Sequence, residues 1–302
     1  MSKIFEALKK SDGEVSGISL PLIDGAGNAA PSNGDELSES FPGSMPEVAI
    51  APVNEAAVKE IPQAEGIRVV TIQPLATAPI LPFDGSHPGA SEQYRILRTR
   101  LSQHPAQPRM IVVSSASPGE GKTTSSVNIA GALALKNDVS VLLVDGDLRR
   151  SSISGLLGID VSPGVAEVVS GAVPLEQAIV RTSQIPNLYV LPAGRSQRNP
   201  AEVLDSPRWK SLCLDLRANF QYVVIDAPPV SGVADYDLIQ ASCDGVIMVI
   251  RPDLTNRKAF KHALGTIPRE LFLGVVVNCV KEWFLWKNSD YSNYYYSDKK
   301  RK

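Results

Sequence analysis

Short runs of Val, Ile and Leu, separated by helix-like segments, constrain the fold of this chain more than any other feature. The apolar runs cover residues 110–113, 139–144, 188–191, 222–225, 245–250 and 273–278. Helical patterns cover residues 123–135, 165–170, 175–182, 207–219 and 257–266. Buried strands that alternate with helices are typical of a parallel sheet with both faces covered. We therefore predict an α/β fold in which helices flank a mostly parallel sheet.

Composition divides the 302 residues into four parts. Residues 1–13 have the pattern of a short amphipathic helix, which would either be a docking or solvated helix or make weak contact with a membrane surface. Residues 14–85, rich in Pro, Gly, Ala, Ser and Asn, are expected to form a flexible, mostly disordered linker. Within this linker, the run Ile67–Ile72 fits an added edge strand. Residues 86–286 form the predicted ordered domain, which opens with a helix, and residues 287–302 form a polar tail.

Charge, cysteine content and hydropathy exclude several classes of protein. The 30 Lys and Arg nearly balance the 32 Asp and Glu, so a global surface for binding polyanions is excluded. The cysteines Cys213, Cys243 and Cys279 are odd in number and widely spaced, which excludes a disulfide framework and fits a reducing compartment. No apolar run reaches the roughly 18–20 residues that span a bilayer. We expect a cytoplasmic protein whose membrane contact requires a partner or a surface helix.

A glycine-rich loop directly follows the first long apolar run. Ala116-Ser-Pro-Gly-Glu-Gly-Lys-Thr-Thr124 leads into a helix and matches a P-loop with Ala in place of the first Gly. Glycines let backbone N–H groups surround phosphate oxygens, the lysine bridges the β- and γ-phosphates, and the following hydroxyl ligates Mg²⁺. The residues expected to bind ATP here are Ser117, Pro118, Gly119, Glu120, Gly121, Lys122, Thr123 and Thr124.

Acidic residues stand at the ends of two further predicted strands. Asp145 and Asp147 follow one strand, and Asp226 ends another. Ligands of such sheets bind outside the carboxyl ends of the strands, so the three carboxylates are expected to converge on the P-loop. Their negative charge requires a cation, which Mg²⁺ and Lys122 would supply. The alternative for Asp145 or Asp147 is that either residue caps the following helix.

Four of the eight tyrosines lie within six residues of the polar tail. They are Tyr291, Tyr294, Tyr295 and Tyr296. Tyrosine normally lies where its ring can be buried, and this segment is too polar to form a core. Three interpretations stand: an aromatic stacking surface, a set of phosphoacceptors, or an end that packs on the domain.

In combination these motifs resemble the bacterial tyrosine autokinases (BY-kinases) of capsule and exopolysaccharide assembly. The resemblance extends from about Gly85 to the end of the chain. It rests on the P-loop, the Asp145–Arg149 box, Ile225–Pro229, the stretch 191–202 and the terminal tyrosines. In addition, Glu92, Arg95 and Arg98 resemble the ring-forming motif of the family. Ser151 and the pair Gln197-Arg198 depart from the prolines that are usual at these positions.

The resemblance implies a role for each matching residue. Lys122 and Thr123 would bind ATP and Mg²⁺, and Asn278 would contact the adenine ring. Asp226 and Asp145 would lie at the metal together with Thr123. Asp147 would accept the tyrosine proton, so the expected catalytic residues are Lys122, Asp145 and Asp147. The expected acceptors are the four tail tyrosines.

The resemblance also implies partners. Subunits would form a homo-oligomeric ring in which the tail of one enters the active site of its neighbour, so that phosphorylation regulates polysaccharide polymerisation and export. A separate membrane-anchored chain-length-determinant protein would act as activator at the inner face of the membrane. A tyrosine phosphatase would reverse the reaction. No nucleic-acid partner is expected, because the basic end Lys299–Lys302 is more typical of a solvated tail.

Two other functions compete with this interpretation. P-loop ATPase switches that position division sites or partition DNA (MinD/ParA-like) share the single motifs. They often carry a second lysine where Ser117 stands, and Ser117 and the tyrosine tail both argue against that class. The second alternative is an ATP-gated regulatory subunit of a polysaccharide polymerase, in which the tail is only a docking tag.

Overall fold

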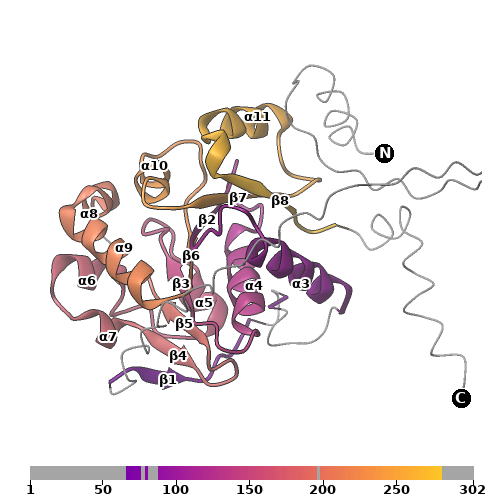
Figure 1. Cartoon of the computed structure of the whole chain (residues 1–302). Coiled ribbons are helices and arrows are strands. Elements are labelled where there is room, and N and C mark those ends of the chain that lie inside the picture. Colours follow the sequence, from indigo (N-terminus) through magenta and orange to yellow (C-terminus); the bar gives the residue numbers. More distant parts are fainter. Residues whose placement is uncertain (1–65, 76–78, 81–87, 196–197, 281–302) are drawn as a thin grey trace, which may run out of the picture. The chain divides into compact units, whose positions relative to one another are not determined.

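The computed structural model describes residues 66–75, 79–80, 88–195 and 198–280. In this part of the chain, eight strands form one sheet (Figure 1). The strands are β1 (Arg68–Val70), β2 (Met110–Ser115), β3 (Val141–Asp145), β4 (Val180–Thr182), β5 (Leu188–Leu191), β6 (Tyr222–Asp226), β7 (Gly245–Ile250) and β8 (Phe272–Val277). Their order across the sheet is β1-β4-β5-β3-β6-β2-β7-β8. Every pair is parallel except β4 with β5, which confirms the predicted fold class.

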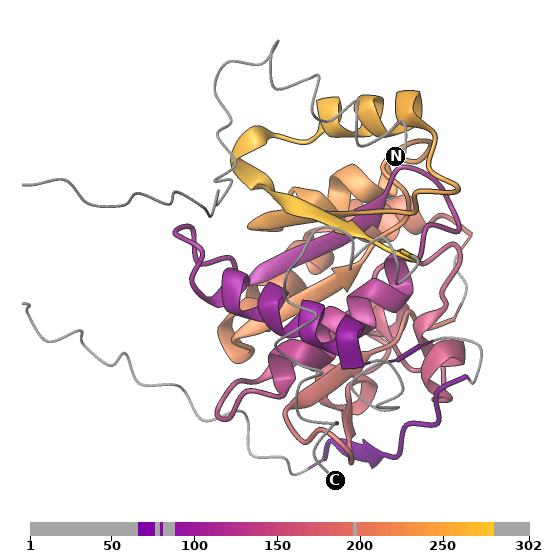
Figure 2. The same cartoon turned by 90° about the vertical axis from the view of Figure 1, so that its right-hand side faces the viewer.

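Helices cover both faces of the sheet (Figure 2). They are α3 (Pro88–Ser102), α4 (Lys122–Ala134), α5 (Ile153–Leu157), α6 (Val165–Ser170), α7 (Leu175–Ala178), α8 (Pro200–Asp205), α9 (Pro207–Asn219), α10 (Asp235–Gln240) and α11 (Arg257–Thr266). A 3₁₀ turn, Arg269–Leu271, precedes β8. Side chains of α3, α4 and α5 pack on one face, and those of α6 to α11 pack on the other.

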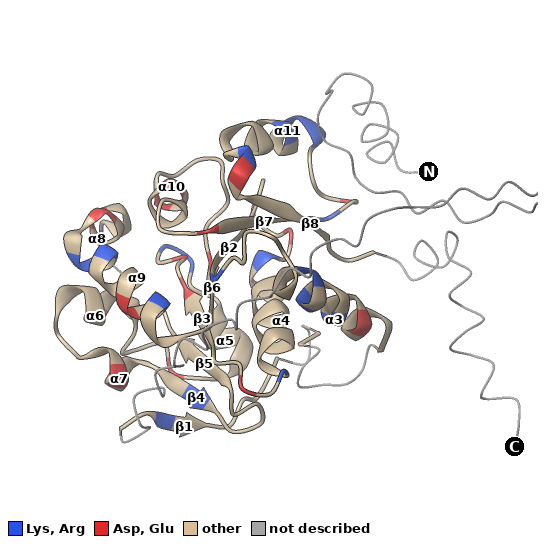
Figure 3. Ribbon diagram, in the orientation of Figure 1, with Lys and Arg blue, Asp and Glu red and all other residues tan. Residues whose placement is uncertain are grey.

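Alternation along the strands separates the two hydrophobic cores. On β2, Met110 and Val112 contribute to the core under α9, whereas Ile111 and Val113 contribute to the core under α4. Every residue of β2, β3 and β7 is buried, as expected for parallel strands covered on both faces. Charged residues therefore lie mainly on helices and loops or at strand ends (Figure 3).

One predicted helix is wrong over half of its length. Residues 175–182 were expected to form a single helix, but α7 ends at Ala178 and Ile179 already has an extended backbone. Val180 begins β4 and pairs with both Arg68 and Val190. Pairing with two neighbouring strands outweighs the weak local preference of this segment. The short helices α5, α8 and α10 were not predicted, because five or six residues carry little periodicity.

Part of the predicted linker lies on the sheet. β1 extends the sheet beside β4, as the pattern of Ile67–Ile72 suggested. Ile72 and Ile80 are buried in the core that contains α4. The Gln184 side chain accepts from the backbone N–H of Ile72 at 3.0 Å and donates to its carbonyl at 2.8 Å, much as a neighbouring strand would. The helix predicted for residues 1–13 and the tail at 287–302 lie outside the described residues.

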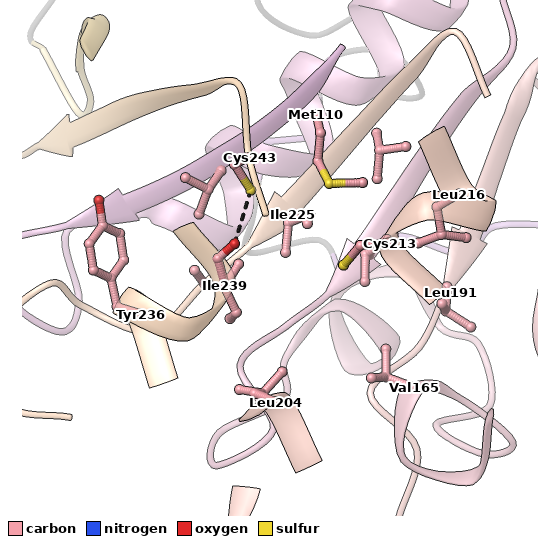
Figure 4. Packing of buried hydrophobic residues seen from close by; sticks show 14 of the residues in the cluster. Met110, Val165, Leu191, Leu204, Cys213, Leu216, Ile225, Tyr236, Ile239 and Cys243 are labelled. Atoms are coloured by element: carbon pink, nitrogen blue, oxygen red, sulfur yellow. Dashed lines mark hydrogen bonds between the residues drawn. The ribbon is translucent and has the colours of Figure 1, made fainter. Parts of the chain in front are cut away.

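The three cysteines are free. Cys213 and Cys243 lie among apolar side chains (Figure 4), and Cys279 is exposed. The Cys243 thiol donates to the carbonyl oxygen of Ile239 at 3.3 Å. Burial raises the pKa of the Cys213 thiol to about 11. Both buried cysteines therefore act as small hydrophobic residues rather than as nucleophiles.

Candidate active site

The P-loop joins β2 to α4, and its glycines fix its path. Gly119 and Gly121 have φ angles of +83° and +91°, which residues with a side chain rarely adopt. A Cβ atom at Gly121 would lie 1.8 Å from Nδ2 of Asn278. Lys122 is the first residue of α4, so the loop ends at a helix N-terminus. This arrangement of backbone N–H groups suits an anionic phosphate.

Three carboxylates meet beside this loop because their strands are neighbours. β3, β6 and β2 are adjacent, with Asp145 in register with Asp226 and Asp226 in register with Val113. Asp145 and Asp226 are fully buried, and Asp147 is 4% exposed. The structure thus brings together the acidic residues that the sequence placed at two strand ends.

Lys122 provides the positive charge among these carboxylates. Its Nζ atom lies 2.9 Å from Oδ2 of Asp147 and 3.5 Å from Oδ2 of Asp226. Burial lowers the pKa of this ammonium group, but the charges of Asp226 and Asp147 outweigh burial and raise it. Lys122 therefore stays protonated at neutral pH.

Asp226 accepts hydrogen bonds from two hydroxyl groups of α4. Thr123 Oγ1 donates to Oδ2 at 2.7 Å, and Ser126 Oγ donates to Oδ1 at 3.1 Å. Burial raises the pKa of Asp226, and Lys122 partly opposes this change. Ser126 was not among the predicted site residues. Its position four residues after Lys122, and therefore on the same helix face, is the sequence signal that would have found it.

Asp145 combines two of the roles considered for it. Its Oδ2 accepts from the backbone N–H groups of Ser152 at 3.2 Å and Ile153 at 3.1 Å, at the start of α5. The alternative of a helix cap is therefore realised, although Asp145 also lies beside Asp226. Its other oxygen, Oδ1, is buried without a hydrogen-bond partner. Burial, together with the charge of Asp226, raises the pKa of Asp145 to about 7.

The residues present fit a magnesium ion carried by a nucleotide. Three buried carboxylates face one ammonium group, and the orphan Oδ1 of Asp145 is an oxygen donor of the kind that Mg²⁺ prefers. Among the described residues, no three His, Cys, Asp or Glu side chains form a ready-made metal cage. Mg²⁺ usually binds through one or two carboxylates, waters and phosphate oxygens. Thr123, Asp145 and Asp226 would be the protein groups at such an ion.

Two further predicted residues brace the P-loop. Asn278 follows β8, and its Nδ2 donates to the carbonyl oxygen of Glu120 at 3.1 Å. The Glu120 side chain is fully buried, and its Oε2 accepts from the backbone N–H of Ser117 at 3.1 Å. Asn278 is therefore placed at the loop, and its contact with adenine stays a prediction.

The ring-motif residues lie on α3, which packs beside α4. Glu92 and Arg95 form an exposed ion pair at 2.8 Å. Arg98 donates instead to the carbonyl oxygen of Ala132, near the end of α4, at 3.3 Å. The four tail tyrosines lie outside the described residues.

A P-loop between a buried strand and a helix, with acidic residues at the ends of the neighbouring strands, defines a P-loop nucleotide-binding protein. The family model described as an AAA domain matches residues 108–269, just over half of the chain. The protein belongs to this family.

Comparisons with relatives define the family more narrowly. The tyrosine-protein kinase CpsD of Streptococcus pneumoniae serotype 4 is 35% identical over 192 residues, which cover 63% of this chain and 84% of the relative. The tyrosine-protein kinase YwqD of Bacillus subtilis is 34% identical over 209 residues, which cover 68% of this chain and 86% of the relative. The kinase domain of the Escherichia coli tyrosine kinase ETK has a TM-score of 0.60 at 25% identity. The match covers 67% of this chain and 82% of the ETK chain. This chain is a member of the bacterial tyrosine-protein kinase family, which confirms the resemblance.

Proposed function

We propose that this protein is an ATP-dependent protein-tyrosine kinase that phosphorylates its own terminal tyrosines. The observation that carries the proposal is Lys122 at the start of α4, in contact with buried Asp147 and Asp226. The family membership supports transfer to tyrosine rather than to water alone. The acceptors would be Tyr291, Tyr294, Tyr295 and Tyr296.

The transfer requires a charge-neutralising site and a proton acceptor. The tyrosine oxygen forms a bond to the γ-phosphorus while the bond to the ADP oxygen breaks, and the phenolic proton leaves. Asp147 would take this proton, because a phenol with a pKa near 10 needs a base within hydrogen-bond reach. Lys122 would stabilise the phosphate charge. Thr123, Asp145 and Asp226 would hold Mg²⁺, which would neutralise the rest of the phosphate charge.

The proposed acceptor tail comes from a neighbouring subunit. The exposed pair Glu92 and Arg95 on α3 supports a contact between subunits in a homo-oligomeric ring. Some 15 tail residues could extend on the order of 50 Å, enough to reach an adjacent site.

Activation and reversal would require two other proteins. None of the described helices has the length and hydrophobicity to cross a bilayer. From the family resemblance, we include a separate membrane-anchored activator, which recruits the kinase from the cytoplasm, and a tyrosine phosphatase. Family resemblance supports regulation of exopolysaccharide or capsule polymerisation and export as the role of this cycle.

The test is the intact mass of the purified protein after incubation with ATP and Mg²⁺, followed by peptide mapping. We expect added phosphate groups on residues 291–296 in the wild type and none in Lys122→Met. Lys136→Met is the matched control, because that lysine is exposed beyond the end of α4. Circular dichroism of all three proteins checks that the fold is retained.

Two outcomes would contradict the proposal. Phosphorylation of Lys122→Met at the wild-type rate would overturn the assignment of the site. A wild type that gains no phosphate, even with the cytoplasmic segment of a candidate activator, would favour an ATP-gated switch instead.

A further inference from the structure

A fully buried carboxylate, Asp235, begins α10 and pairs with a half-exposed arginine. Arg149 Nε donates to Oδ2 of Asp235 at 2.7 Å, and Nη2 donates to Oδ1 at 2.9 Å. Both carboxylate oxygens are thus bound by one planar guanidinium group. An unpaired carboxylate in this position would be costly, so the pair fixes the position of Arg149.

Arg149 lies in the middle of the loop that carries Asp147 and joins β3 to α5. The loop leaves β3 at Gly146, whose N–H donates to the carbonyl oxygen of Asp226 at 2.8 Å. Leu148 is 4% exposed and packs in the core. The N–H of Arg150 donates to Oδ1 of Asp147 at 3.0 Å. The loop is therefore held at its start by the Gly146 backbone bond, at Leu148 by burial, and at Arg149 by the ion pair with Asp235.

The same ion pair joins the two acidic loops of the site. Asp235 lies on the segment that follows Asp226, and this segment is itself attached to β2. The N–H of Ala227 donates to the carbonyl oxygen of Val113 at 3.0 Å, and that of Val230 donates to Ser115 at 2.9 Å. Asp235 itself is fully buried at the first residue of α10, so the ion pair links the loop of Asp147 to a packed part of the domain.

We propose that the Arg149–Asp235 pair is a positioning device that holds the Asp147 carboxylate beside Lys122, in the place where it receives the tyrosine proton. Its effect on catalysis rests on the proposed kinase function. Arg149 and Asp235 act here through the loop backbone, as positioning residues. The Lys122–Asp147 distance of 2.9 Å is the geometry that the pair maintains.

The kinetic test compares Asp235→Asn, Arg149→Gln and the double variant. Asp235→Asn keeps the shape of the side chain and removes the charge, so it is the variant expected to fold best. We expect the rate of tyrosine phosphorylation at saturating ATP to fall about tenfold in each single variant and little further in the double variant. The KM for ATP should stay within about twofold, because the P-loop is untouched. Arg149→Lys should restore only part of the rate, since a lysine cannot bind both oxygens in one plane.

Arg217→Gln is the matched control. Arg217 also pairs with a carboxylate, Asp244 at 2.7 Å, but this pair lies at the opposite ends of the strands, before β7 begins. The substitution Arg217→Gln should reduce the stability of the fold without changing the phosphorylation rate. An equal loss of rate in Arg217→Gln would show that the effect is general destabilisation and would overturn the proposal.

Hydrogen–deuterium exchange of residues 146–151 gives a readout that does not depend on kinase activity. We expect faster exchange in Asp235→Asn and Arg149→Gln, and wild-type exchange in Arg217→Gln. Unchanged exchange in both pair variants would overturn the positioning role. If exchange responds while the wild type transfers no phosphate, the positioning role stands and the proposed kinase function fails.

Discussion

At the scale of single residues, Gly121 shows how little space separates the P-loop from the end of β8. Its positive φ angle and its contact with Asn278 both exclude a side chain. We predict that Gly121→Ala weakens ATP binding at least about tenfold, because the loop or Asn278 must shift. Titration with a fluorescent ATP analogue measures this change. Gly265→Ala is the control, since no atom lies within 4 Å of a Cβ at that position in α11. Equal affinities for the two variants would contradict the prediction.

Asp244 ties the start of β7 to its surroundings in a way that depends on pH. Burial raises the pKa of its carboxyl group, but hydrogen bonds from Met110 N–H and Arg217 outweigh burial and lower it. A lowered pKa stabilises the fold above the unfolded-state value and ceases to do so as the pH falls through the folded-state value.

We therefore predict that Asp244→Asn reduces the free energy of unfolding by about 1–2 kcal/mol near pH 7. The difference from the wild type should shrink as the pH falls below the ordinary carboxyl value of 3.8. Urea unfolding near pH 7 and near pH 3 provides the comparison. If the difference in free energy of unfolding is the same at both pH values, the charge of Asp244 is not the cause of the destabilisation.

At the scale of elements, residues 66–75 and 79–80 contribute more to the fold than their composition suggests. Ile80 is fully buried against α4, whereas Leu75 is 52% exposed. We predict that Ile80→Ala lowers the free energy of unfolding by about 2–4 kcal/mol, because a buried side chain is replaced by a cavity. Leu75→Ala, in the same segment, should change it by less than about 0.5 kcal/mol. Denaturant titration measures both, and similar values would show that the segment does not pack as described.

Central strands could be predicted from the sequence because they are buried on both faces and read as continuous apolar runs. β5 and β7 match their predicted ranges. The boundary between α7 and β4 could not be predicted, since Val180 becomes a strand only through its partners Arg68 and Val190. Such pairing depends on residues far away in the chain, which local patterns do not reveal.

The same distinction applies to the candidate site. The P-loop and the strand-end residues Asp145 and Asp226 follow from local spacing, and the structure brings them together. The bond between Asp145 and the start of α5 and the contact of Ser126 with Asp226 depend on the packed fold. Asp235, the partner of Arg149, lies 86 residues further along the chain, so no short sequence motif contains both residues.

At the scale of the whole molecule, α3 offers a test of the predicted ring. Glu92 and Arg95 are exposed, whereas Arg98 also bonds the end of α4. We predict that replacing all three with alanine lowers the oligomeric state, measured as mass by light scattering. The double variant Glu92→Ala/Arg95→Ala should give the same result without loosening α3 from α4. Arg100→Ala, exposed on the same helix, is the control. An unchanged mass in the triple variant would remove the support for a ring through this motif.

The position of β1 at the edge of the sheet has a consequence for synthesis on the ribosome. Thr71 and Ser183, whose hydroxyl groups are hydrogen-bonded just beyond β1 and β4, are 112 residues apart in the chain. At typical rates of translation, β1 emerges on the order of ten seconds before β4 exists to pair with it. During that interval the strand has no partner within its own chain. Until β4 is synthesised, chaperones or other nascent chains can therefore bind the segment that later forms the edge of the sheet.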